Sequence, residues 1–93
     1  MKYGVYCIQD AVAEEFLSPV LHPSDAVARR SFENVVLAQG DSSGPLYTHA
    51  SGYTLYKVAD FDSELAQFDA VVPVQYIVNA GNVVAQMFSK EDS

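Results

Sequence analysis

Histidine and serine are the residue types here whose chemistry would suit zinc binding or nucleophilic catalysis. The chain has two histidines, His22 and His49. They do not stand in the H-x-x-x-H, H-x-H or H-E-x-x-H spacings that bring two imidazoles to one zinc ion. No G-x-S-x-G motif supports a Ser–His–Asp triad, so both histidines are interpreted as ordinary loop residues.

Carboxylate pairs and a glycine-containing loop are the remaining candidates for chemistry. Glu14/Glu15 and Asp60/Asp62 are close in sequence, but acidic residues in turns are normally solvated rather than arranged for general acid–base catalysis. The loop 40–44 (GDSSG) lacks the lysine and the following helix that a phosphate-binding loop needs. The sequence therefore predicts no catalytic, metal-binding or cofactor-binding residue, and a protein that is not an enzyme.

The basic residues are few, and two of them are adjacent. Arg29 and Arg30 lie on the outer face of a predicted helix, where Glu33 is spaced to form helical ion pairs with them. Their alternative role is contact with a phosphate or an acidic partner, to which Lys57 would add a charge. Leu37, predicted on the same outer face, hints at a protein interface.

Tyrosine is the commonest aromatic residue, and five of its six copies fall on predicted strands: Tyr3, Tyr6, Tyr53, Tyr56 and Tyr76. Alternation along a strand must send some of these rings away from the core. Exposed rings on a sheet can stack unpaired bases or form the centre of a subunit interface. Because the net charge is −7 with only five Lys/Arg, the interface is favoured. Residues predicted to contact a partner or nucleic acid are Arg29, Arg30, Lys57, Tyr3, Tyr6, Tyr53 and Tyr56.

The element that must position these residues is a helix predicted over Pro23–Gly40. Ser24 is placed to cap its first turn, Asp25 suits the positive end of the helix dipole, and Gly40 suits the left-handed residue that closes a helix. At 100° per residue one half of the helix is mainly apolar. That half contains Val27, Ala28, Ser31, Phe32, Val35, Val36 and Ala38.

Three strands are predicted, over Lys2–Gln9, Tyr53–Phe61 and Val71–Val78. In the first strand both alternating sets of side chains are largely apolar, which suits a strand covered on both faces, or on one face plus a partner. Pro73 cannot donate a ladder hydrogen bond, so the third strand lies at a sheet edge or Pro73 sits at its start or at a bulge. The expected fold is α+β in two layers, with the helix packed on a small, mostly antiparallel sheet of three or four strands.

The connections are less strongly patterned. Residues 11–23 are predicted as a short helix or an extended arm, because Pro19 and Pro23 forbid a long helix. Asp41–Gly52 is a predicted loop with Leu46 turned back onto the core. Asp62–Ala70 is a predicted connection with a helical turn at Ser63–Gln67. A turn at Asn79–Gly81 precedes Asn82–Phe88, a short helix or a last strand, and 89–93 is a predicted frayed tail.

Length and composition predict a single domain, residues 1–93, that folds and carries an acidic surface. Hydrophobic residues make up 49% of the chain, which is too many for a disordered protein. Cys7 is the only cysteine, so it has no partner for an intrachain disulfide and is expected to be buried. No apolar run is long enough for a signal peptide or a membrane span, which predicts a cytosolic protein with no membrane partner.

Several segments in a fixed order resemble a known phage family. The strand YGVYCIQD is followed by AEEF, then by PSDAVARRSF entering a helix, then by LYTHASGYTLYKVADFD and VVPVQYIVNA. This series, from Tyr3 to Ala80, resembles the small non-structural protein of gokushovirus-type microviruses, which are phages with single-stranded DNA genomes. The order and spacing of the segments carry the resemblance.

The resemblance implies a role in the cytoplasm of an infected bacterium. Family members are described as non-structural and sometimes as DNA-binding, and are likened to the microvirus protein that switches synthesis to single-stranded genomes for packaging. The resemblance thus implies a non-enzymatic accessory protein of genome replication, with no catalytic residue to carry over. The expected partners are a second copy of the chain, with a dimer favoured, and phage replication proteins or a host factor. The alternative is a single-stranded DNA-binding protein.

Overall fold

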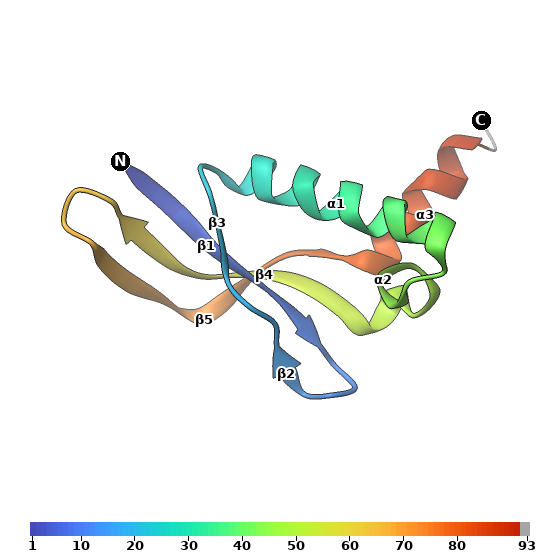
Figure 1. Cartoon of the computed structure of the whole chain (residues 1–93), viewed down its shortest axis with the longest axis horizontal. Helices are drawn as coiled ribbons and strands as arrows, with labels where there is room; N and C mark the ends of the chain where they lie inside the picture. The colour runs from blue at the N-terminus through green and yellow to red at the C-terminus, as the bar shows by residue number, and fades with distance from the viewer. Residues whose placement is uncertain (92–93) are drawn as a thin grey trace.

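The computed structural model describes the backbone of residues 1–91 and the side chains as far as Met87, and it places one antiparallel sheet beside a layer of helices (Figure 1). The strand order is β2-β1-β4-β5, with β3 also paired to β1. The strands are β1 (Lys2–Asp10), β2 (Glu15–Phe16), β3 (Val20–His22), β4 (Tyr53–Asp62) and β5 (Gln67–Asn79). The predicted two-layer α+β fold is confirmed.

Helix α1 spans Asp25–Ser42, so it begins and ends two residues later than the predicted Pro23–Gly40. The predicted cap is confirmed, because the Ser24 hydroxyl accepts a hydrogen bond from the Val27 amide at 3.2 Å. The predicted end at Gly40 is wrong: Ser43 takes the left-handed conformation instead, with φ 57°. Gly40 stays helical, and its missing side chain lets the Tyr47 ring pack closely, since a Cβ there would lie 3.1 Å from that ring.

The buried face of α1 is narrower than predicted. Ala28, Phe32 and Val36, spaced four residues apart, are the fully buried positions, whereas Val35 is 44% exposed and Ala38 is also exposed. Leu37, predicted on the outer face, packs partly against the core. The reason is a second helix, which lies along α1 on the Leu37 side and shifts the core between the two helices and the sheet.

That second helix is α3 (Ala80–Glu91), preceded in the chain by α2 (Pro45–Thr48) and a 3₁₀ turn, η1 (Ala50–Gly52). The helical alternative for 82–88 is therefore correct and the strand alternative is wrong. Leu46 is buried as expected, although its loop contains α2 and η1. The turn predicted at 79–81 is absent, because β5 runs directly into α3. The predicted tail at 89–93 is helical as far as Glu91, and residues 92 and 93 lie outside the described residues.

Residues 11–23 adopt the extended alternative, and the helical one is wrong. The Asp10 carboxylate accepts hydrogen bonds from the amides of Val12 and Ala13, which turns the chain back along β1. The Leu17 amide then donates to the Ile8 carbonyl at 2.7 Å, and β2 and β3 pair antiparallel with β1.

The helical turn predicted at Ser63–Gln67 is wrong, because β4 and β5 form a long hairpin. The Asp62 carboxylate accepts a hydrogen bond from the Glu64 amide at 2.9 Å, and Ala66 has φ 52° where the chain reverses. An aspartate that bonds to the backbone two residues on is a turn former. The third strand therefore begins at Gln67 rather than at Val71, and the distal part of the hairpin extends beyond the helices (Figure 1).

Strand β5 is an edge strand with a bulge, as Pro73 predicted. Lys57 pairs with Gln75 and Ala59 with Ala70, so four residues of β5 stand opposite one of β4. Pro73, which follows a cis peptide bond, lies within this bulge. No helix among residues 1–91 has the length and apolar character required to cross a membrane.

Candidate interaction surface

The predicted tyrosines separate onto the two faces of the sheet. Tyr6 and Tyr53 point toward the helices, where Tyr6 is buried and Tyr53 packs against the core. Tyr3 and Tyr56 lie on the opposite face. Tyr76, on the edge strand β5, contacts the Tyr56 ring, while its hydroxyl reaches the start of α3. The seven residues predicted as contacts therefore do not lie on one face of the sheet, and their contact with a partner stays a prediction.

The sheet face opposite the helices, here called the open face, carries two groups of aromatic rings. In one group the ring of Tyr56 has edge contacts with Phe16 and Tyr76, at centroid distances of 5.9 and 6.2 Å. In the other group Phe61 and Phe68 pair across β4 and β5 at 4.6 Å, beside Tyr3 on β1. Such ring pairs contribute about 0.5–1.5 kcal/mol beyond the burial of their area.

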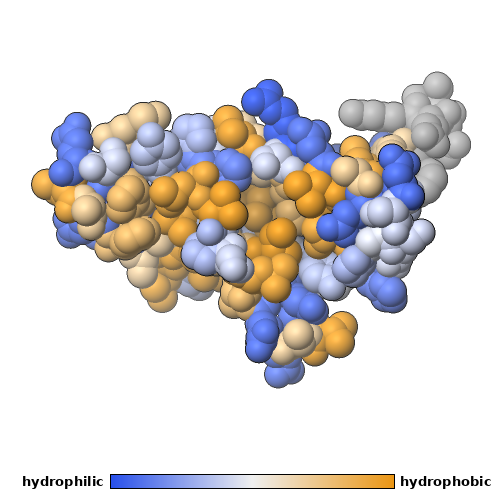
Figure 2. Space-filling view, viewed as in Figure 1, coloured by the Kyte–Doolittle hydropathy of each residue, from blue (hydrophilic) through white to orange (hydrophobic). Residues whose placement is uncertain are grey.

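Small apolar residues connect the two aromatic groups. The strand pairing places Ala59 and Ala70 between them, beside the buried Val5, with Leu21 of β3 at the margin. Phe68, Tyr76 and Phe16 are 61%, 52% and 46% exposed. By alternation along the described strands, no charged side chain falls on this face. Hydrophobic residues gather where the hairpin extends beyond the helices (Figure 2).

The phenylalanines of the open face were missed by the sequence prediction. Phe16 lay in a predicted short helix or extended arm and Phe68 in a predicted connection, so neither was placed on the sheet, whereas Phe61 ended a predicted strand but was not named as a contact. The available signal was the near symmetry of Phe61 and Phe68 about the segment 63–66, which follows the turn-forming Asp62 and has the spacing of a hairpin turn.

The Tyr6 hydroxyl donates a hydrogen bond to the Asp25 carboxylate at the first turn of α1. Burial raises the pKa of Tyr6 well above its ordinary value, and the hydrogen bond to Asp25 and the negative charges of Asp25 and Asp60 raise it further. A Cβ on Gly4 would lie 2.6 Å from Cε2 of the Tyr6 ring. Tyr6 thus serves to position α1 on the sheet.

Two of the predicted cations are paired with carboxylates. Arg29 Nε donates to Glu33 Oε2 at 3.3 Å, which is the helical ion pair predicted from their spacing. Lys57 Nζ lies 2.9 Å from Asp60 Oδ1, and this hydrogen bond raises the pKa of Lys57. Arg30 is exposed on the outer side of α1. None of the three belongs to the open face.

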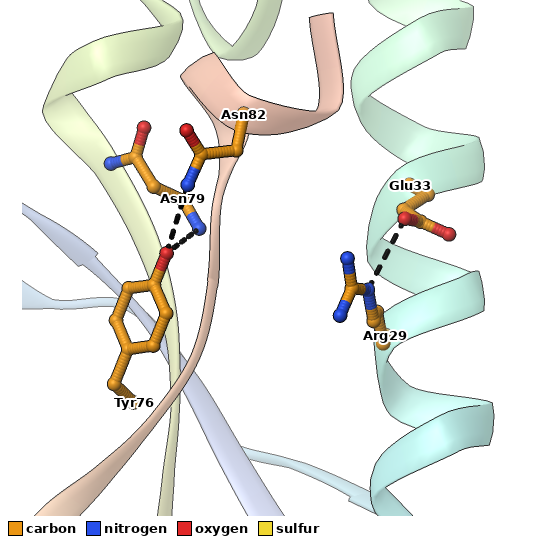
Figure 3. A network of polar contacts seen from close by, with 5 residues as sticks. All are labelled: Arg29, Glu33, Tyr76, Asn79 and Asn82. Atoms are coloured by element: carbon orange, nitrogen blue, oxygen red, sulfur yellow. Dashed lines mark hydrogen bonds and ion pairs between the residues drawn. The ribbon is translucent and has the colours of Figure 1, made fainter. Parts of the chain in front are cut away.

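A groove of about 370 Å³ runs between α1, α3 and the free edge of β5. Arg29 borders it on one side, and Tyr76, Asn82 and Gln86 border it on the other. In Figure 3 the Tyr76 ring rises from β5 toward the start of α3, while Arg29 and Glu33 face each other on α1. The Tyr76 hydroxyl accepts hydrogen bonds from the Asn79 amide at 3.0 Å and from Asn82 Nδ2 at 3.1 Å.

Asn79 ties the start of α3 to its neighbours. Its side-chain oxygen accepts from the Gly81 amide at 2.8 Å, as an N-cap does, and its Nδ2 donates to the Ser51 carbonyl and to Thr54 Oγ1. Because most polar groups on this side of the groove bond to one another, the network serves to hold α3 on the end of the sheet.

A second, smaller cavity of about 140 Å³ lies between α1, β1 and β3, with a mainly apolar lining. His22 borders it, and its ring lies 5.8 Å from that of Tyr6. His49 is exposed, with Nδ1 2.9 Å from Thr48 Oγ1. Cys7 is buried, as predicted, and burial raises its pKa. Among the described residues, no three His, Cys, Asp or Glu side chains cluster as metal ligands.

Together these features define a small α+β protein with one aromatic, uncharged sheet face. The family model described as Phage ORF5 protein matches residues 3–83, and the chain therefore belongs to this family of phage proteins. Neither the curated proteins nor the solved structures provide a match.

Proposed function

We propose that this phage protein assists genome replication in the bacterial cytoplasm without catalysis, through contacts with proteins. More specifically, we assign the protein to the gokushovirus-type microviruses. Its proposed partners are phage replication proteins or a host factor, together with further copies of the chain. In this role it favours the synthesis of single-stranded genomes for packaging. Membership of the Phage ORF5 protein family supports the phage context.

The observation that carries the proposal is the character of the open face. Aromatic rings are enriched in the centres of protein interfaces, where charged residues are depleted. The open face has this composition, with Phe16, Phe68 and Tyr76 largely exposed. A contiguous apolar surface on a soluble protein marks a place where another surface docks.

The competing function is binding of single-stranded DNA by stacking of bases on the same rings. Such binding combines stacking with a cationic groove that follows the phosphates. Here Arg29 and Lys57 are paired with Glu33 and Asp60, and neither lies on the open face. With a net charge of −7, the chain repels phosphate overall, which favours a protein as the partner.

Two experiments test the proposal. Affinity capture from phage-infected cells, with and without nuclease, should recover the same phage or host replication protein in both arms. Fluorescence anisotropy with a labelled single-stranded oligonucleotide at 50 mM and 200 mM salt should show no binding. Micromolar binding that weakens steeply with salt would instead establish the DNA-binding function.

A further inference from the structure

We infer that the open face is the surface through which two copies of this chain form a symmetric dimer. The inference deepens the proposed function, because it rests on that face being a protein-binding surface and names a second copy as the protein. Face-to-face packing would place the two sheets about 10 Å apart, with the helical layers outside.

The isolated chain exposes more surface than a compact monomer of its size. Its accessible surface is 5864 Å², whereas a monomer of 10.1 kDa exposes about 5,300 Å². Its radius of gyration is 14.1 Å, against about 12 Å expected for a domain of this length. The excess, roughly 550 Å², approaches the ~800 Å² that each partner buries in a standard interface.

The open face suits a two-fold arrangement because its two ends are alike. The Phe16–Tyr56–Tyr76 group lies toward one end and the Phe61–Phe68 pair toward the other, with small residues between them. A two-fold axis through the middle would set each aromatic group of one copy against the other group of its partner. Large rings then meet large rings, while Ala59 and Ala70 allow the sheets to approach.

Pairing through the sheet edge is the alternative route to a dimer, and β5 is built against it. Its free edge is interrupted by the four-residue bulge, where Pro73 has no amide hydrogen to donate. Bulges and prolines on edge strands are known to prevent edge-to-edge pairing. The opposite edge is formed only by the two-residue strand β2 and the three-residue strand β3, and edge strands this short offer little for pairing. The face, rather than either edge, is therefore the surface that we assign to self-association.

Charge gives the dimer a distinctive dependence on salt. Each copy carries a net charge of −7, so two copies repel each other, while the open face itself contributes no charge. Added salt screens this repulsion, and dimerisation should therefore strengthen between 20 and 200 mM salt. Binding of DNA would show the opposite trend, because salt weakens contacts to phosphate.

The test is sedimentation equilibrium of the full chain and of two matched variants. The unmodified chain should show twice the 10.1 kDa mass of the monomer, with a dissociation constant that falls as salt rises. Phe68→Lys adds a charge to the open face and should raise that constant at least about tenfold. Val35→Lys adds the same charge at an exposed position on α1 and should leave it unchanged.

Circular dichroism will show whether each variant folds. If Phe68→Lys does not fold, Phe16→Lys probes the other end of the face in the same way. Isotope-filtered NOEs between labelled and unlabelled copies should connect rings of the open face. A monomeric chain at NMR concentrations, a dimer insensitive to both face variants, or NOEs confined to the helices would overturn the inference. The infected-cell capture would stand independently, since a monomer could still bind a replication protein.

Discussion

Replacing Tyr6 by phenylalanine isolates the contact that fastens the start of α1 to the sheet. The substitution keeps the buried ring and removes only the hydroxyl that donates to Asp25. Asp25 is the first residue of the helix, so this one bond joins β1 to the element that carries much of the core.

The expected loss follows from the nature of the bond. A hydrogen bond to a charged group contributes about 1.5–3 kcal/mol, and the acceptor that loses its partner must then be solvated. Asp25 is only partly buried, so water can reach it after the substitution, and the loss should lie near the lower end, about 1.5 kcal/mol. A domain of this length has a total stability of about 5–14 kcal/mol, so the loss is readily measured.

Urea unfolding monitored by circular dichroism at pH 7, at one protein concentration, gives the free energy of unfolding of each variant. Tyr53→Phe is the matched control, because it also keeps a ring against the core and its hydroxyl has no hydrogen bond among the described residues. A loss below about 0.5 kcal/mol for Tyr6→Phe, or one equal to that of the control, would refute the reasoning.

The same variant tests the shifted pKa of Tyr6. Because its pKa is raised in the folded state, the unfolded chain loses this proton first, from about its ordinary pKa of 10.0. The stabilisation is complete below that pH and decreases above it, by up to about 1.4 kcal/mol per pH unit. The buried Cys7 adds a similar loss beginning near pH 9.0. Tyr6→Phe should show a shallower alkaline decrease than Tyr53→Phe, and equal slopes would contradict the assignment.

Three further substitutions separate buried, tightly spaced and exposed positions. Phe32→Ala should lower the free energy of unfolding by about 3–5 kcal/mol in the same urea assay, because the ring is buried beneath α1. Gly4→Ala should cost about 1–3 kcal/mol, since the new Cβ overlaps the Tyr6 ring; a cost near zero would show that the ring moves freely. Arg30→Ala should change stability by less than about 0.5 kcal/mol, because Arg30 is exposed, and any effect should appear in captured partners instead.

The elements with complete local signals were predicted well. Ser24, Asp25 and the apolar repeat located α1, and the alternation of apolar residues located β1 and β4 to within a residue. Pro73 was sufficient to place β5 at an edge or at a bulge, because a missing amide hydrogen has the same consequence in any sheet.

The errors arose where a distant segment overrides the local preference. The Ser63–Gln67 segment looks helical alone, yet the cross-strand partners Phe61 and Phe68 favour a hairpin. Glycine is typical of a helix end, yet Gly40 lies within α1. There the absence of a side chain leaves room for the ring of Tyr47 from α2. Neither contact is visible in a local pattern.

The sequence predicted a sheet face that carries tyrosines, but not which residues lie on it. Several tyrosines were expected on the sheet face opposite the helix. Which ones lie there depends on the register of the paired strands. A bulge at Val58 shifts the phase of β4, so that Lys57 aligns with Tyr6 while Ala59 aligns with Val5. A shift of one residue moves every later side chain to the other face, which is why Phe61 could not be assigned without the paired strands.

The clearest sequence signal for the open face was the first strand itself. A strand with one solvated face alternates apolar with polar residues, whereas Tyr3, Val5 and Cys7 continue an apolar pattern on the side away from the helices. The three helices lie on the Tyr6 side of the sheet. On the other side Val5 and Cys7 are buried within the chain itself, whereas Phe16 and Phe68 remain exposed. A second copy of the same face would cover these exposed rings, because it supplies apolar surface of equal extent.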